Sequence, residues 1–146
     1  MLLVRDLLRT KGNQVWSVTP KTNLLDMLRM LGEKDVGALV VLEDDKLVGI
    51  ISERDFARLI GKSGSVPLNG QVEMIMTREV IHVDPNQTIE QVMQLMSEKH
   101  IRHLPVLEND KLVGLISIGD VVKAIISDQQ SLIRDLEDYI EGGYAR

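Results

Sequence analysis

Two serine–aspartate pairs have the residue types and the spacing to bind a phosphorylated sugar. Ser52 precedes Asp55 by three positions, and Ser117 precedes Asp120 in the same way. Each serine falls where a predicted strand gives way to a predicted helix, and the free amides at the start of a helix attract phosphate. A carboxylate there can accept hydrogen bonds from a ribose diol, each worth about 1.5–3 kcal/mol because the acceptor is charged.

The same four residues also have a purely structural interpretation. Serine followed three positions later by an acidic residue is the pattern of a capping box, which satisfies the first amides of a helix. A capping box would accept glutamate at the fourth position as well as aspartate. Aspartate in both pairs therefore favours a binding role, while the capping role stays open.

The two pairs are related by an internal duplication. Val15–Asp55 aligns without a gap on Val80–Asp120, with 17 identities over 41 positions at an offset of 65 residues (120 minus 55). Two copies of roughly 60 residues are too few and too long for a typical repeat array. The duplication predicts two half-domains packed about a pseudo-twofold axis, with a ligand groove between them.

Each copy is predicted to fold as β-α-β-β-α, which gives an α+β protein. An extended segment (Val15–Val18 or Val80–Val83) leads into an amphipathic helix capped by Asn23 or Thr88, and an apolar hairpin and a second helix follow. The apolar stripes of the first helices are Leu24, Leu28 and Leu31 in one copy and Ile89, Val92, Met93 and Met96 in the other. The predicted boundaries are 1–62 for the first domain, 63–70 for a linker, 71–127 for the second domain and 128–146 for a C-terminal helix and tail.

Composition and charge argue against several classes of function. The net charge of −5 disfavours a broad nucleic-acid interface, and the absence of cysteine excludes disulfides and thiolate chemistry. No apolar run reaches the roughly 20 residues of a membrane span, and the N-terminus lacks a secretion signal, which together predict a cytoplasmic protein. We expect neither catalysis nor a bound metal, because no nucleophile–base set is readable and the pair His100 and His103 lacks further ligands.

The stretches VGALVVLEDDKLVGIISERD and IRHLPVLENDKLVGLISIGD resemble a tandem pair of cystathionine β-synthase (CBS) domains, known as a Bateman module. The resemblance covers residues from about 3 to 127 and suggests a stand-alone CBS-domain protein of bacterial type. It implies that the chain binds an adenine nucleotide and regulates another protein without catalysis. Ser52 and Ser117 would face phosphate, and Asp55 and Asp120 would hold the ribose hydroxyls.

The resemblance also implies which other residues line the nucleotide sites. Arg54, Arg102 and His103 would contact phosphate, with a solvated surface charge as the alternative for the two arginines. The backbone of the adenine pocket would come from Gly37, Ala38 and Leu39 in the first copy and from His103, Leu104 and Pro105 in the second. The residues that would close the pocket are Thr10, Trp16, Ser17, Thr77, Ile81 and His82. For Trp16, a core or dimer-interface role is the alternative.

The two sites are not expected to be equivalent, because the stretch Lys99–His103 carries an arginine and two histidines that the corresponding Lys34–Ala38 lacks. The expected ligand is AMP, ADP, ATP (with Mg²⁺) or NAD(H). The alternatives are an S-adenosylmethionine-binding regulator and a ligand-free scaffold for dimerisation or interaction.

The expected partners are a second copy of the chain, in a homodimer, and an unidentified regulated protein, but neither a nucleic acid nor a membrane. The C-terminal helix carries one apolar stripe, composed of Leu132, Leu136, Tyr139 and Ile140. This stripe is expected to pack on its own module or on a second subunit.

Overall fold

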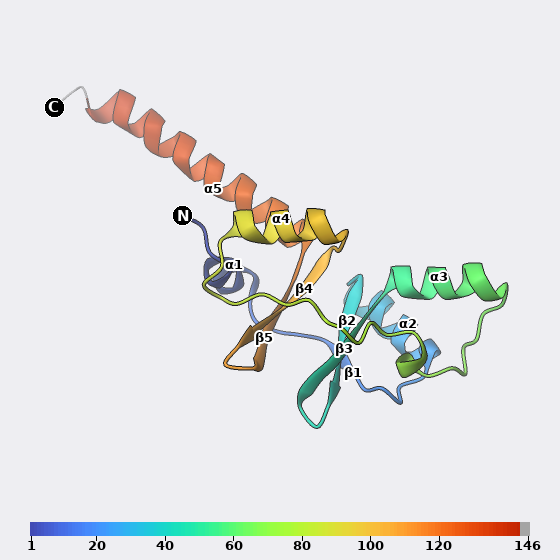
Figure 1. The fold of residues 1–146 in the computed structure, drawn as a ribbon. Helices are drawn as coiled ribbons and strands as arrows, with labels where there is room; N and C mark the ends of the chain where they lie inside the picture. Colours follow the sequence, from blue (N-terminus) through green and yellow to red (C-terminus); the bar gives the residue numbers. More distant parts are fainter. Residues whose placement is uncertain (144–146) are drawn as a thin grey trace.

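The computed structural model describes residues 1–143 and shows two similar halves, with a long C-terminal helix that extends from the second (Figure 1). The first half contains β1 (Ser17–Val18), α2 (Leu24–Lys34), β2 (Ala38–Glu43), β3 (Lys46–Ser52) and α3 (Glu53–Ser63). The second half contains α4 (Ile89–Lys99), β4 (His103–Glu108), β5 (Lys111–Ser117) and α5 (Ile118–Asp138). Helix α1 (Val4–Lys11) precedes the first half, and the 3₁₀ turn η1 (Val72–Met74) precedes the second. A π-helical turn, η2 (Tyr139–Gly143), follows α5. The predicted α+β class is confirmed.

The two hairpins are equivalent, but their sheets differ in size. Strand β1 pairs in parallel with β2, which pairs antiparallel with β3, whereas the second sheet contains only β4 and β5. The predicted extended segment Val80–Val83 makes a single parallel bridge, between Val83 and Val106. Pro105 stands where Val40 stands in the first copy, and it has no N–H with which to extend the ladder.

Each half is completed by a segment that precedes the other half. Val4 and Leu7 of α1 are buried in the core of the second half, beside Leu104 and Ile116. Val72 and Met76, from the segment between the two copies, are buried in the core of the first half. The segment before the first copy therefore packs on the second copy, and the segment before the second copy packs on the first.

The apolar stripe of each first helix is turned slightly from its predicted position. In α2 the buried residues are Leu24, Met27 and Leu31, and in α4 they are Ile89, Val92 and Met96. Leu28 is only half-buried, and Met93 is 41% exposed, so placing Met93 in the core stripe was wrong. Positions 27 and 92 are equivalent in the two copies, and both point into a core.

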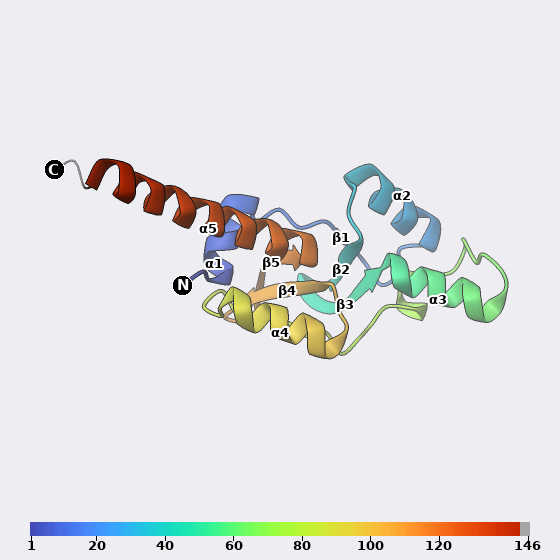
Figure 2. The same ribbon diagram turned by 90° about the horizontal axis from the view of Figure 1, so that it is seen from above.

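Helix α5 is one continuous element that runs from the second half into the C-terminal extension. Its first turns pack against α1 and α4, and its distal part projects away from both halves (Figures 1 and 2). The projecting part carries exposed apolar side chains, whose exposed fractions lie between 54% and 63%. These side chains are Leu132, Ile133 and Leu136 in α5 and Tyr139 and Ile140 in the adjoining turn η2.

The packing of α1 on the second copy predicts how a substitution in α1 changes the free energy of unfolding. Leu7→Ala should lower the free energy of unfolding by about 2–5 kcal/mol, because it empties a site in the second core. Leu68→Ala is the matched control, because Leu68 is 36% exposed and lies outside both cores, and it should cost much less. Urea unfolding measures both changes. Equal effects of the two substitutions would contradict the packing of α1.

Candidate functional site

The first serine–aspartate pair forms a complete capping box at the start of α3. The backbone N–H of Ser52 donates to Asp55 Oδ2 at 2.8 Å, and the backbone N–H of Asp55 donates to Ser52 Oγ at 3.4 Å. The Ser52 hydroxyl also donates to Asp55 Oδ2, at 3.1 Å. The structural interpretation of this motif is therefore realised. Within residues 1–143, Asp55 Oδ1 accepts no hydrogen bond, so one carboxylate oxygen is available to a ligand.

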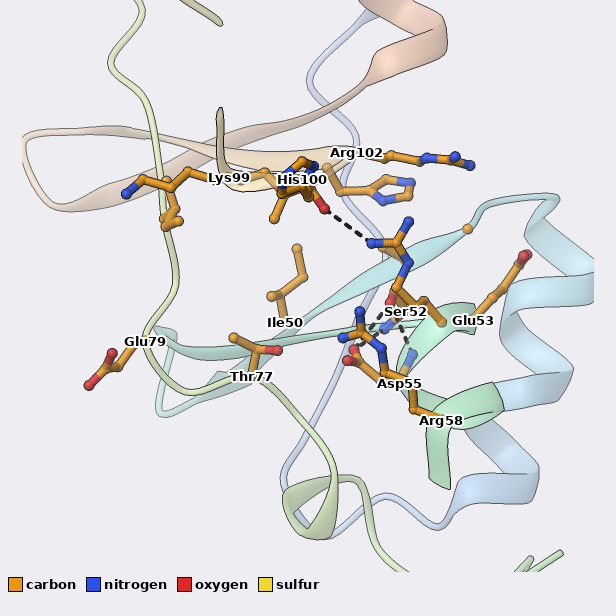
Figure 3. A pocket seen from close by; sticks show the side chains of 16 residues that line it. Ile50, Ser52, Glu53, Asp55, Arg58, Thr77, Glu79, Lys99, His100 and Arg102 are labelled. Atoms are coloured by element: carbon orange, nitrogen blue, oxygen red, sulfur yellow. Dashed lines mark hydrogen bonds between the residues drawn. The ribbon is translucent and has the colours of Figure 1, made fainter. Parts of the chain in front are cut away.

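Asp55 faces a cavity of about 350 Å³ at the junction of the two copies (Figure 3). The first copy contributes the start of β2, the end of β3 and the start of α3. The second copy contributes the loop between α4 and β4, and the chain that leads into the second copy contributes the remaining wall. The lining residues, in that order, are Gly37, Ala38, Ile50, Ser52, Glu53, Arg54, Asp55, Arg58, Lys99, His100, Ile101, Arg102, His103, Thr77, Glu79 and Ile81.

The cavity gathers cations in a chain whose net charge is negative. Arginine and lysine side chains line it from both copies: Arg54, Arg58, Lys99 and Arg102. Only three carboxylates line it, those of Glu53, Asp55 and Glu79. Figure 3 shows Lys99 and Arg102 on one side of the cavity, with Ser52, Asp55 and Arg58 on the other. The positive end of the α3 dipole adds to this positive side, although the amides of Glu53 and Asp55 already donate to Gly37 O and Ser52 Oγ.

Arg54 links the two copies across the cavity. Its Nη1 donates to the backbone carbonyl of His100 at 3.1 Å, as the dashed line at His100 in Figure 3 shows. His100 ends α4 in the left-handed conformation (φ 54°), which turns the chain into the cavity wall. The Arg54 side chain is thus held beside Asp55 by the opposite copy.

The second serine–aspartate pair caps α5 in the same way but has an additional partner. The backbone N–H of Ser117 donates to Asp120 Oδ2 at 2.8 Å, and the backbone N–H of Asp120 donates to Ser117 Oγ at 3.1 Å. Lys11 Nζ also donates to Asp120 Oδ2 and to the carbonyl of Leu115. Burial would raise the pKa of Asp120, but the hydrogen bonds and charge of Lys11 and the hydrogen bonds of Ser117 outweigh it and lower the pKa.

His103 lies at the junction between the two serine–aspartate motifs. Burial and the nearby charge of Lys11 lower its pKa, and the carboxylates of Asp120 and Glu53 only partly oppose that shift. The neutral form of the imidazole is therefore favoured. A Cβ on Gly37 would approach His103 Cε1 to 3.2 Å, so the glycine leaves the space that the ring occupies.

The structure brings half of the predicted site residues together at the Asp55 cavity. These are Gly37, Ala38, Ser52, Arg54, Asp55, Thr77, Ile81, Arg102 and His103. The cluster Lys99–His103 of the second copy thus lines the same cavity as Ser52 and Asp55 of the first copy.

The other predicted residues lie elsewhere. Thr10 and Asp120 line a groove of about 590 Å³ between α1 and α5, and Ser117 caps α5. Trp16 packs on the first core under the ammonium of Lys34, which is 4.2 Å from its ring centroid. Ser17 borders a separate depression, and His82 is exposed. Leu39, Leu104 and Pro105 are buried.

Sequence reasoning missed several residues of the two motifs' surroundings: Ile50, Glu53, Arg58 and Glu79 at the first, and Lys11 at the second. Arg58 could have been found, because it follows Arg54 by one helical turn and shares its face of α3. Lys11 had no local signal, because it meets Asp120 across 109 residues of sequence.

Among residues 1–143, no group of three or more histidine, cysteine, aspartate or glutamate side chains is arranged to hold a metal ion. In the same part of the chain, no helix has both the length and the apolar character needed to cross a membrane.

The fold and the cavity define a tandem module, in which two duplicated half-domains share one charged junction. The family model described as "CBS domain" matches residues 4–62 and 72–127, and the chain belongs to the CBS domain family. Pairs of these domains generally act as regulatory modules.

The chain is similar to one curated relative and to two solved structures. The mitochondrial CBS domain-containing protein CBSX3 of Arabidopsis thaliana is 36% identical over 151 residues, which cover 97% of this chain and 73% of that protein. The crystal structure of a CBS-domain-containing protein from Agrobacterium tumefaciens is 39% identical with a TM-score of 0.81, covering 84% of this chain and 98% of that chain. A CBS domain pair crystallised with 5′-methylthioadenosine and S-adenosyl-L-methionine shares the fold, with a TM-score of 0.77 at 23% identity over 88% of this chain and 98% of that one.

The contact between Lys11 and Asp120 predicts a change in acid titration. Because the folded pKa of Asp120 is lowered, its contribution to stability is present above its unfolded pKa and is lost as pH falls through the folded value. Lys11→Met should raise the pKa of Asp120, as measured by NMR titration of the carboxyl carbon. The stability difference between the two proteins should shrink as pH falls through the folded pKa. Lys21→Met, which removes an exposed partner of Glu73, is the control and should leave Asp120 unchanged. An unchanged Asp120 titration in Lys11→Met would contradict the contact.

Proposed function

We propose that the Asp55 cavity binds an adenine nucleotide and that the bound ligand regulates a partner protein. The observation that carries this proposal is the meeting of Ser52 and Asp55 at a helix start with cations from the opposite copy. Asp55 accepts the ribose hydroxyls, and the phosphates lie among Arg54, Arg58, Lys99 and Arg102 at the positive end of the α3 dipole. The apolar side chains of Ile50, Ile81 and Ile101 provide contacts for the base.

The charge of the cavity favours a phosphorylated ligand over S-adenosylmethionine. S-Adenosylmethionine has a cationic sulfonium and no phosphate, whereas four cations and three carboxylates line this cavity. AMP, ADP, ATP with Mg²⁺ and NAD(H) all combine adenosine with negative charge. The CBS pair crystallised with 5′-methylthioadenosine and S-adenosyl-L-methionine supports an adenosyl ligand in this fold, and only the fold is shared with it. The volume of about 350 Å³ lies in the usual range for small-ligand pockets.

Ligand binding could regulate a partner protein because residues of both copies line the cavity. Because both copies contribute contacts, a ligand that binds one arrangement of the copies more tightly shifts the equilibrium toward it. The role we propose is non-catalytic. A cytoplasmic location stays a prediction, since the Arabidopsis relative is described as mitochondrial.

The proposed function is tested by ligand-dependent stability. AMP, ADP, ATP with Mg²⁺, NAD⁺, NADH and S-adenosylmethionine are compared in a thermal-shift assay. A phosphorylated ligand should stabilise the protein by about 2.7 kcal/mol at 100 times its Kd, and S-adenosylmethionine should stabilise it least. Asp55→Asn keeps an acceptor for the Ser52 amide but loses the charge. It should weaken nucleotide binding about tenfold in calorimetry, since a charged acceptor adds about 1.4 kcal/mol.

The control for Asp55→Asn is Asp26→Asn, which changes the equivalent third position of α2 outside the cavity and should bind normally. If Asp55→Asn binds every nucleotide as tightly as the wild type, Asp55 does not hold the ribose. If none of the six compounds stabilises the wild type, the ligand-free scaffold becomes the better account of the module.

We also propose that the projecting part of α5 pairs with α5 of a second copy. Ile126, Ile133 and Leu136 are spaced by seven and three residues, which is the spacing of a coiled-coil seam. These side chains are 50–54% exposed within one chain, and a second copy would bury them.

Leu136→Glu should convert the dimer to a monomer, because it places a charge in the seam, and sedimentation velocity measures the change. Ser131→Glu adds the same charge on the opposite face of α5 and should leave the dimer intact. A monomeric wild-type protein, or a dimer that survives Leu136→Glu, would exclude this interface.

A further inference from the structure

The second serine–aspartate motif already holds a cation from its own chain. Lys11 Nζ donates to Asp120 Oδ2 and to the carbonyl of Leu115, so the ammonium lies beside the residues that would receive a ribose. The side chains of Lys11 and Asp120 are 32% and 22% exposed, so the pair is partly withdrawn from solvent. Charge-assisted hydrogen bonds of this kind are stronger than neutral ones.

The first copy has a different partner at the equivalent place. Ile50 is the counterpart of Leu115, and its carbonyl accepts the backbone N–H of Thr77 at 2.9 Å. The residue that corresponds to Lys11, with two extra residues in the first copy, is Arg78. Arg78 is not among the residues that line the Asp55 cavity, and its Nη2 donates to the carbonyl of Glu73 at 3.1 Å. Asp55 is therefore left without a side-chain cation on its carboxylate.

The difference arises from local structure before each copy. The segment that precedes the first copy is helical as far as Lys11, whereas the segment before the second copy has only the 3₁₀ turn Val72–Met74, after which Thr77 forms a bridge with Ile50. The last turn of α1 projects Lys11 toward Asp120, because Val4 and Leu7 anchor that helix in the second core.

The Lys11 ammonium changes what Asp120 can offer a nucleotide. Oδ1 accepts no hydrogen bond within residues 1–143 at either aspartate, but the charge of Asp120 is already paired with an internal cation at Oδ2, which also accepts from the Ser117 amide. A ribose diol that bonds to both oxygens of Asp120 would have to displace the ammonium. The space next to Asp120 also differs from the Asp55 cavity, because it is bounded by α1 and α5 and not by the β-strand starts of both copies.

We infer that Lys11 is an internal ligand that closes the second nucleotide site, so that each chain binds one nucleotide, at Asp55. This inference rests on the proposed function of the Asp55 cavity. It assigns Lys11 the role of setting the number of ligands, and it explains why a motif can be present twice and used once. Removing the ammonium should free Asp120 for a second ligand.

The test counts bound AMP, which contains the adenine, ribose and phosphate common to the proposed nucleotides. Equilibrium dialysis with radiolabelled AMP up to millimolar concentration should give one AMP per chain for the wild type and two for Lys11→Met. Adding Asp120→Asn to Lys11→Met should weaken the second site about tenfold, and adding Asp55→Asn should weaken the first by a similar factor. Lys21→Met is the control and should bind one, because Lys21 lines neither the Asp55 cavity nor the Asp120 groove and forms an exposed pair with Glu73. Circular dichroism confirms that each variant is folded.

The outcomes separate the inference from the function on which it rests. Two AMP molecules on the wild type, or one on Lys11→Met, would overturn the closing role of Lys11 and leave nucleotide binding intact. No binding to the wild type, with one AMP on Lys11→Met that Asp120→Asn weakens, would support the closing role and refute the Asp55 site. No binding to either protein would refute both.

Discussion

The organisation of this molecule depends on the exchange of leading segments between its two halves. Neither copy fills its core alone: α1 supplies Val4 and Leu7 to the second core, and the segment around η1 supplies Val72 and Met76 to the first. Burial of the apolar surface of these side chains contributes the free energy that holds the two halves together. The same exchange brings Thr77 to the motif of the first copy and Lys11 to the motif of the second. The packing of the leading segments therefore determines which residues lie beside each serine–aspartate motif.

Around this frame, polar groups at the strand-to-helix junctions have two tasks. Ser52 and Asp55 satisfy the first amides of α3, as Ser117 and Asp120 do for α5. Capping needs only part of each carboxylate, because Oδ1 is free of hydrogen bonds at both positions within the described chain. Helix stability and ligand contact are thus compatible at Asp55. The two interpretations that the sequence left open are not exclusive.

Electrostatics then distinguish the two junctions. The Asp55 cavity draws Lys99 and Arg102 from the second copy and positions Arg54 through the carbonyl of His100. The Asp120 motif draws Lys11 onto its carboxylate, and this contact contributes to the lowered pKa of Asp120. A cation facing an open cavity can receive an external anion, whereas a cation bound to the carboxylate is already neutralised. Two nearly identical stretches of sequence consequently have different chemical environments.

The sequence by itself determined the duplication, the α+β class, the helix caps and the apolar hairpins, because all of these depend on neighbouring residues or on a pattern written twice. Local sequence patterns also identified the cation cluster Lys99–His103. The predicted apolar stripe of α4 was wrong at Met93, because the buried face of the helix is rotated slightly from the predicted one. The tertiary structure alone decided that this cluster serves the opposite copy, that Pro105 limits the second sheet, and that Lys11 reaches Asp120. These contacts join residues far apart in the chain, and their geometry is set by how two cores exchange helices, which no local spacing encodes.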